Sequence, residues 1–228
     1  MTRATNARIA GLTLLLYIAA GLTSMVLFRQ AAGGEGVAAK LVSIAAHAGD
    51  AGILVLLGLV QCFSAIVLAV TLYAITRDED GDLAMLGLVC RVGEGIIGAL
   101  SIPAILALFW LAARGADAPD AAAARALAAY LLRDDVALTA TFFAVGSTAF
   151  AWLLLRGRMI PTLLAWLGLV ASAILVIGLP LRLAGWLEDP LASIIWLPML
   201  AFEVPLGIWL LTKGVAAPST AEARIRAA

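Results

Sequence analysis

Long apolar blocks alternate with short polar connectors along the whole chain. A helix needs about 20 mainly apolar residues to cross a bilayer, whereas a strand of a membrane barrel needs only about 10 and alternates polar with apolar positions. The blocks have the helical length and do not alternate. We therefore predict an all-α fold, a polytopic transmembrane helix bundle. Its six expected spans are residues 9–28, 51–75, 83–112, 136–155, 161–181 and 191–211.

Two connectors are longer than simple turns and carry apolar residues of their own. Residues 30–50 contain a run from Val37 to His47, and residues 117–135 contain an alanine-rich run that ends near Arg133. Both runs predict short helices that are too short to cross a bilayer. We expect them at the membrane interface, or capping the bundle, on the same side of the membrane. A helical connector is the simpler interpretation, and a lid over an opening is the alternative.

The composition agrees with membrane residence. Hydrophobic residues make up 64% of the chain, charged residues make up 13%, and the mean hydropathy is +1.06. Soluble domains are roughly half apolar and a quarter charged. We therefore treat residues 1–228 as a single membrane domain whose first partner is the lipid bilayer.

Charge and metal-binding residues exclude several classes of function. Fifteen basic and fifteen acidic residues cancel, so no net field favours nucleic acid. Cys62 and Cys90 lie inside apolar blocks without paired-ligand spacing, and His47 is the single histidine, so no metal or cofactor is expected. The run Gly93-Glu-Gly-Ile-Ile-Gly98 matches the dinucleotide fingerprint in its letters, but it lies inside an apolar helical block and does not follow a strand.

Lysine and arginine in the connectors predict the orientation. With the N-terminus inside, eight basic residues fall on the inner side: Arg3, Arg8, Arg77, Arg156, Arg158, Lys213, Arg224 and Arg226. Six fall on the outer side: Arg29, Lys40, Arg114, Arg125, Arg133 and Arg182. We expect a multi-pass protein of the cell membrane with both termini in the cytoplasm.

Three charged residues lie within predicted spans: Arg91, Glu94 and Glu203. An ionised side chain at the bilayer centre costs a few kcal/mol on insertion scales, so such residues normally face the bundle interior and have partners. Arg91 and Glu94 are three apart and can pair on their own helix. Glu203 lies between Pro198 and Pro205, each of which removes a backbone donor beside the carboxylate.

These three residues support two interpretations. They could form a binding site for a proton or a small molecule, since two acids and one arginine leave one carboxyl group without a countercharge. They could also form a static ion-pair network that holds the third and sixth spans together. Substitution of each glutamate by glutamine distinguishes these interpretations, because the static network predicts that no folded variant loses an activity.

Other polar residues are weaker candidates. Tyr17 and Gln61 are the deepest, and we include them in the candidate polar site. The rest are expected to make ordinary interhelical hydrogen bonds: Thr13, Ser24, Thr141 and Ser147. Ser43, His47 and Asp50 succeed one another along a helix, but a catalytic triad requires side chains that converge.

Several short motifs occur in a set order over most of the chain. They are Arg8-Ile-Ala-Gly11 with Tyr17, Arg91-Val-Gly-Glu94, Pro161 with Leu167-Gly168, and Glu203 followed by Trp209-Leu-Leu-Thr-Lys213-Gly214. This order resembles the bacterial membrane protein family labelled domain of unknown function 4386. The family usually has an arginine after the turn proline, where this chain has Thr162. The resemblance implies a multi-span inner-membrane protein and supplies no activity.

Three functions are compatible with the sequence. The first is an uncharacterised membrane protein that binds or moves a small molecule or proton at the Arg/Glu cluster. The second is a membrane-embedded enzyme in which Glu94 or Glu203 acts as general acid on a lipid or isoprenoid, although no nucleophile or metal motif supports it. The third is a non-catalytic membrane partner subunit.

Overall fold

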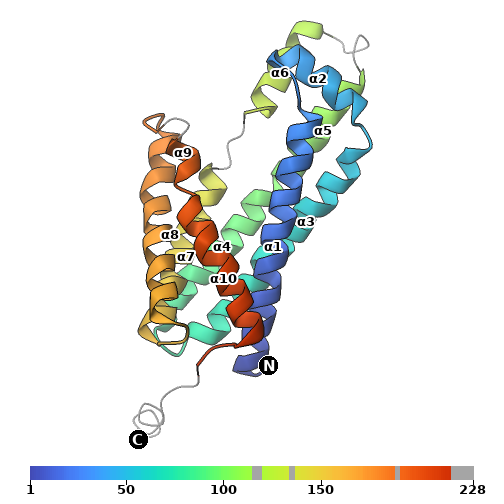
Figure 1. The fold of residues 1–228 in the computed structure, drawn as a ribbon. Coiled ribbons are helices and arrows are strands. Elements are labelled where there is room, and N and C mark those ends of the chain that lie inside the picture. Colours follow the sequence, from blue (N-terminus) through green and yellow to red (C-terminus); the bar gives the residue numbers. More distant parts are fainter. Residues whose placement is uncertain (115–119, 134–136, 188–190, 217–228) are drawn as a thin grey trace, which may run out of the picture. The chain divides into compact units, whose positions relative to one another are not determined.

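The computed structural model describes residues 1–114, 120–133, 137–187 and 191–216, and all regular secondary structure in these ranges is α-helical. The all-α prediction is therefore confirmed (Figure 1). The described helices are α1 (Arg3–Ala31), α2 (Gly36–Ala46), α3 (Asp50–Thr76), α4 (Gly81–Ala99), α5 (Ser101–Arg114), α6 (Ala121–Leu131), α7 (Ala137–Arg156), α8 (Thr162–Leu183), α9 (Leu191–Ile194) and α10 (Leu197–Thr212). Several residues used in the sequence analysis lie outside the described ranges: Asp117, Asp135, Val136, Arg224 and Arg226.

Five helical segments of the described chain are long and apolar enough to cross a membrane: α1, α3, α4 taken together with α5, α7 and α8. They correspond to the first five predicted spans. The sixth predicted span is divided into α9 and α10, and α10 has 16 residues, or about 24 Å at 1.5 Å per residue. A full span covers about 30 Å of hydrocarbon. The sixth segment is thus a shorter apolar helix than predicted.

The third predicted span contains a break that hydropathy alone did not indicate. Helix α4 ends at Ala99 and α5 begins at Ser101. Pro103 has no N–H for the carbonyl of Ala99, so the regular ladder cannot continue across this point. The Leu100 N–H instead bonds the Ile97 carbonyl at 3.0 Å, which is the tighter bond of a turn.

The helices group into two compact units. The first unit contains residues 1–15, 64–94 and 137–228, and the second contains residues 16–63 and 95–136. Helices α1, α3 and α4 each contribute residues to both units. The single membrane domain remains a prediction.

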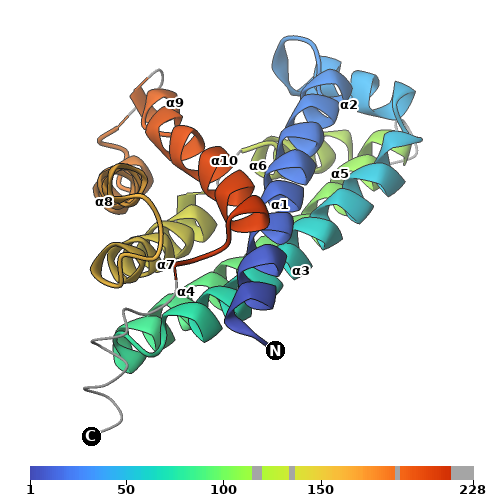
Figure 2. The ribbon, with the colours of Figure 1, turned by 60° about the horizontal axis from the view of Figure 1, so that its bottom comes forward.

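Small residues allow close helix packing in the first unit. Helix α8 contacts both α7 and α10 (Figures 1 and 2). Gly11 of α1 lies against α10, where a Cβ atom on Gly11 would be 2.5 Å from the Leu211 nitrogen and 2.6 Å from the Gly207 carbonyl oxygen. Such close backbone approach is typical of membrane helices, which gain little from the hydrophobic effect and associate through tight packing.

Three connectors meet at one end of the first unit. Arg156 Nη1 lies 3.4 Å from Asp80 Oδ2, which joins the connector before α4 to the end of α7. The Ala216 N–H donates to the Met159 carbonyl at 3.0 Å, which brings the segment after α10 to the same turn. These contacts bring the three connectors together, and their position on one side of the membrane stays a prediction.

The second unit contains both predicted connector helices, and their helical structure is confirmed. Helices α2 and α6 contact each other, and both contact α5 (Figure 1). Their buried residues, Ile44 and Ala128, join a core that includes Leu108 and Phe109 of α5. Asp120 caps α6 by accepting the Ala122 N–H at 2.8 Å. Their interfacial position remains a prediction.

Candidate functional site

Helix α4 places Arg91 and Glu94 on one face and buries both. Each side chain is 2% exposed, and Arg91 Nη1 lies 2.9 Å from Glu94 Oε2. This is the i, i+3 spacing that brings two side chains of a helix together. The predicted pairing within the third span is confirmed.

Helix α7 covers the arginine. The guanidinium carbon of Arg91 lies 4.7 Å from the ring centroid of Phe143, within cation–π range. The Phe143 ring in turn lies 5.9 Å from the ring of Trp196, the residue that precedes α10. The side of the guanidinium that faces α7 is therefore bounded by aromatic carbon.

A glycine allows this close approach of α7 to α4. A Cβ atom on Gly146 would lie 2.8 Å from Arg91 Cγ and 3.1 Å from the Gly87 carbonyl oxygen. Both distances are shorter than an ordinary carbon contact of about 3.5–4.0 Å. Any larger residue at position 146 would push against the aliphatic stem of the arginine.

Glu203 of α10 lies at a small cavity that Arg91 also lines. The cavity has a volume of about 30 Å³. Its polar lining comes from Arg91, Ser147 and Glu203, and the apolar lining comes from Leu14, Leu68, Leu72, Phe150, Ala151, Leu154, Phe202 and Leu206. All these residues belong to the first unit. The structure thus brings the third and sixth predicted spans together at the expected charges.

The Glu203 carboxyl group differs from that of Glu94 in its contacts. It is partly exposed, and it interacts electrostatically with Arg91 and Glu94. Within the described part of the chain it makes no ion pair within 4.0 Å and no hydrogen bond. Glu94 is the direct ion-pair partner of the Arg91 guanidinium. Glu203 is therefore a second acid in a cluster that contains one arginine.

Pro205 lies inside α10, two residues after Glu203, and Pro198 lies in its first turn. Only Pro205 interrupts the helical ladder, because a proline in the first turn replaces an N–H that would be unpaired in any case. The carbonyl that lacks its usual donor is that of Ala201, four residues before Pro205, because a helical N–H bonds the carbonyl four residues earlier.

Tyr17 and Gln61 belong to the second unit and do not line this cavity. Gln61 instead lies against α1, where a Cβ atom on Gly21 would be 2.8 Å from Gln61 Nε2. Both residues are partly buried. They remain candidates from the sequence.

Two of the weaker polar candidates, Thr13 and Thr141, are satisfied by their own helices. The Thr13 hydroxyl donates to the Ile9 carbonyl at 2.8 Å, and the Thr141 hydroxyl donates to the Ala137 carbonyl at 2.7 Å. His47 Nδ1 lies 2.8 Å from the Ser43 carbonyl, so this ring contacts its own helix backbone and does not face a nucleophile. Within the described ranges, no group of three His, Cys, Asp or Glu side chains could hold a metal ion.

Ser147 is the one weaker candidate that lines the cavity, and Phe143 was not predicted at all. Ser147 lines the cavity, and its hydroxyl makes no hydrogen bond to a described residue, unlike the hydroxyl of the neighbouring Thr148. Phe143, Gly146 and Ser147 are spaced by three and four residues, which places them on one face of α7. That spacing was visible in the sequence, but the sequence did not indicate that this face meets Arg91.

The fold and the site define a class: an α-helical membrane protein with a buried Arg–Glu pair and a second glutamate, partly exposed, beside it. Within that class the chain belongs to the family described as Domain of unknown function (DUF4386), whose pattern it matches over residues 9–214. The resemblance inferred from the motifs is therefore confirmed. Neither the curated proteins nor the solved structures gave a match.

Proposed function

We propose that this membrane protein takes up and releases a proton at Arg91, Glu94 and Glu203. The observation that carries the proposal is the position of Glu203, at a small cavity beside an arginine that already has a carboxylate partner at 2.9 Å. If all three groups were ionised, the cluster would hold one uncompensated negative charge in a poorly solvated place. A single proton shared by the two acids removes that charge, because one protonated and one ionised carboxyl group balance one guanidinium.

The size of the cavity favours a proton over an organic ligand. Pockets that bind small molecules usually measure about 300–1,000 Å³. The cavity at Glu203 measures about 30 Å³, which is room for one or two water molecules. A water molecule in that space is a natural carrier of a proton between the carboxyl group and the remainder of the protein.

The same volume argues against the enzyme alternative. A general acid must lie about 2.6–3.2 Å from the atom that it protonates, so a lipid or isoprenoid substrate would have to enter the cavity. No such molecule fits into about 30 Å³. The static network remains the direct competitor, because it requires the same contacts and no proton exchange.

A pH jump on the full-length protein in nanodiscs tests the proposal. We expect the wild-type chain to take up about one more proton than Glu203→Gln when the pH falls from about 8 to about 6, above the range in which solvated carboxylates are protonated. Glu35→Gln is the matched control, because Glu35 is exposed at the start of α2 and makes no side-chain cap.

Equal uptake by the wild-type chain and Glu203→Gln would overturn the proposal and leave a static ion-pair network. Circular dichroism of each variant confirms that the helices are intact before the comparison is made.

The proposed location is the cell membrane, with both termini in the cytoplasm. The excess of lysine and arginine on one set of connectors supports it. The contacts of Asp80 with Arg156 and of Ala216 with Met159 support it as well, because they join connectors that this topology assigns to one side. A reporter fused after Arg158 that proves extracytoplasmic would reverse the orientation.

A further inference from the structure

A second cavity lies in the first unit, between α4, α7 and α8, and contains none of the charged cluster. Its volume is about 340 Å³. The lining residues are Leu83, Leu86, Val145, Thr148, Ala149, Trp152, Leu169 and Val176. The one hydroxyl among them, that of Thr148, donates to the Ala144 carbonyl of its own helix at 2.8 Å. We call this cavity the groove. Its lining is a mainly hydrocarbon surface.

One end of this groove is polar. Leu83 follows Asp80 by three residues on α4, and Trp152 precedes Arg156 by four residues on α7. Asp80 caps α4 by accepting the Leu83 N–H at 3.1 Å, and it lies 3.4 Å from Arg156. Since residues three and four apart share a helix face, the Asp80–Arg156 pair lies one turn beyond the apolar lining.

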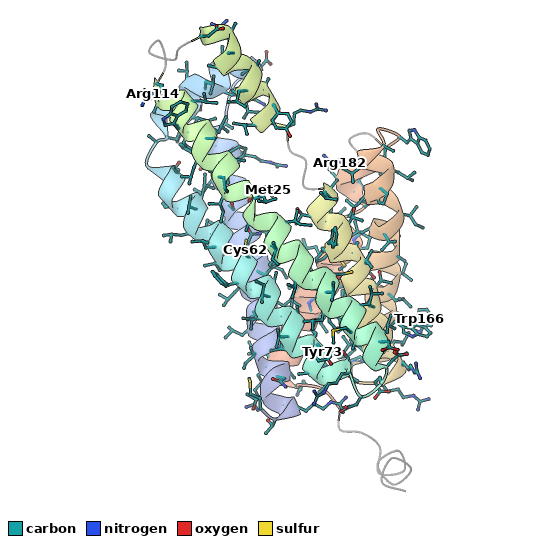
Figure 3. The ribbon with its side chains drawn as sticks, turned by 180° about the vertical axis from the view of Figure 1, so that it is seen from behind. Met25, Cys62, Tyr73, Arg114, Trp166 and Arg182 are labelled. Atoms are coloured by element: carbon teal, nitrogen blue, oxygen red, sulfur yellow. The ribbon has the colours of Figure 1, made fainter. Side chains whose placement is uncertain are left out.

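Two exposed tryptophans lie near the Asp80–Arg156 end of the groove. Trp152 is 43% exposed, and Trp166 is 50% exposed and lies one helical turn before the groove residue Leu169 of α8. Figure 3 shows Trp166 projecting away from α8. Exposed tryptophan is typical of the level at which hydrocarbon meets the headgroups. This places the Asp80–Arg156 end of the groove at headgroup depth.

The turn after α7 carries a second arginine in an unfavourable backbone conformation. The Met159 N–H bonds the Leu154 carbonyl at 3.0 Å and the Arg158 N–H bonds the Leu155 carbonyl at 3.1 Å, which is the pattern of a Schellman motif. Arg158 occupies the left-handed position of that motif, with φ +47°, where glycine is usual. Its side chain is exposed, so its guanidinium is accessible at this end of the groove.

We propose that this groove and turn bind one anionic phospholipid. An acyl chain lies in the groove, and the phosphate binds the guanidinium groups of Arg156 and Arg158. The part of α7 that lines the groove, from Val145 to Trp152, is about 10 Å long. The hydrocarbon of one leaflet is about 15 Å deep, so the groove can hold most of the length of one acyl chain. The proposal is independent of proton exchange at Glu203.

Nearby acids compete with the phosphate but do not exclude it. Asp80 holds Arg156 at 3.4 Å, and both side chains of that pair are well exposed, at 38% and 52%. An exposed pair of this kind contributes little, so a phosphate can replace or share the carboxylate. The Glu79 side chain approaches the same turn, because a Cβ atom on Gly157 would lie 3.0 Å from its carboxyl carbon.

Lipid binding to the full-length protein in detergent tests the proposal, by native mass spectrometry with phosphatidylglycerol, phosphatidylcholine or inorganic phosphate as the probe. We expect one phosphatidylglycerol to be retained in preference to phosphatidylcholine. Arg156→Gln and Arg158→Gly should each weaken its retention roughly fivefold, the contribution of one basic residue near an anionic headgroup. Arg77→Gln is the matched control, because Arg77 is exposed at the same end but follows α3, which does not line the groove.

The chain in the groove is tested separately. Val145→Phe fills part of the lining without altering any charge, and it should lower phosphatidylglycerol retention while the helical circular dichroism signal is unchanged. Arg158→Gly should not lower the melting temperature in lipid-free detergent, since it relieves the left-handed residue, and this separates loss of binding from loss of folding.

Two results would overturn the proposal. One is an equal loss of lipid in Arg77→Gln, which would mean a general charge effect. The other is inorganic phosphate binding as tightly as phosphatidylglycerol, with Val145→Phe unaffected, which would mean an anion site that does not hold an acyl chain.

Discussion

The charge balance of the cluster predicts how its two glutamates depend on each other. With both acids present, Glu94 pairs with Arg91 at 2.9 Å and Glu203 lies at the neighbouring cavity. In Glu203→Gln the pair is intact, so the free energy of unfolding should change by less than about 1 kcal/mol. In Glu94→Gln the remaining carboxyl group, Glu203, can ionise and compensate the guanidinium.

The double variant removes both carboxylates of the cluster from the buried Arg91. Loss of the partner of a buried charge typically costs about 3–5 kcal/mol. We therefore expect the double variant to lose at least about 1 kcal/mol more than the sum of the single variants, within the usual range of coupling between contacting residues. A loss greater than the sum distinguishes a shared countercharge from independent contacts, because independent contacts would give additive losses.

Reversible unfolding of the purified protein in mixed micelles, followed by far-ultraviolet circular dichroism, measures these differences. Glu35→Gln, alone and with each cluster variant, provides the control for the same chemical change at an exposed site. Additive losses in the double variant would refute the claim that the two acids share one countercharge.

Three further predictions concern the contacts of Arg91 with α7 and the turn after α7, and each is measured by the same unfolding assay. Gly146→Ala should destabilise the protein by about 1–3 kcal/mol, because the added Cβ contacts the aliphatic stem of Arg91. The control Gly52→Ala, which has nothing within 4 Å of its added Cβ, should be neutral or stabilising. Equal effects of the two substitutions would contradict the close approach of α7 to Arg91. Phe143→Leu should lose the cation–π contact and destabilise by about 1–2 kcal/mol, and an unchanged stability would show that the 4.7 Å contact contributes nothing. Arg158→Gly in lipid-free detergent should stabilise by about 1 kcal/mol, and a clear loss would mean that φ +47° at this residue is not strained.

Hydropathy was sufficient to predict the helices, because the bilayer requires each spanning segment to satisfy its backbone within one helix. It did not predict the break at Leu100 or the shortness of α10. The break depends on a single residue, Pro103, and α10 begins beside another, Pro198 in its first turn; neither proline changes an average over 20 positions by much. The proline effect is local, so it could have been found by checking which carbonyl each proline leaves without a donor.

The candidate site was predictable to the extent that it depends on one helix or on the cost of buried charge. Arg91 and Glu94 are neighbours by helical spacing alone, and Glu203 was selected because a carboxylate is expensive within a span. The places of Phe143 and Ser147 depend on the register between α4 and α7. That register is determined by close packing at Gly146, and a single sequence does not specify which of several glycines meets which helix.

The protonation state of Glu203 is the most direct test of the account, and infrared difference spectroscopy of the protein in nanodiscs measures it. When the pH falls from about 8 to about 6, above the range of solvated carboxylates, the carbonyl stretching band of one protonated carboxyl group should appear. The band should be absent in Glu203→Gln, absent in Glu94→Gln, where Glu203 must remain ionised to compensate Arg91, and retained in Glu35→Gln. A wild-type spectrum without the band, or a band that persists in both cluster variants, would contradict proton exchange at this site.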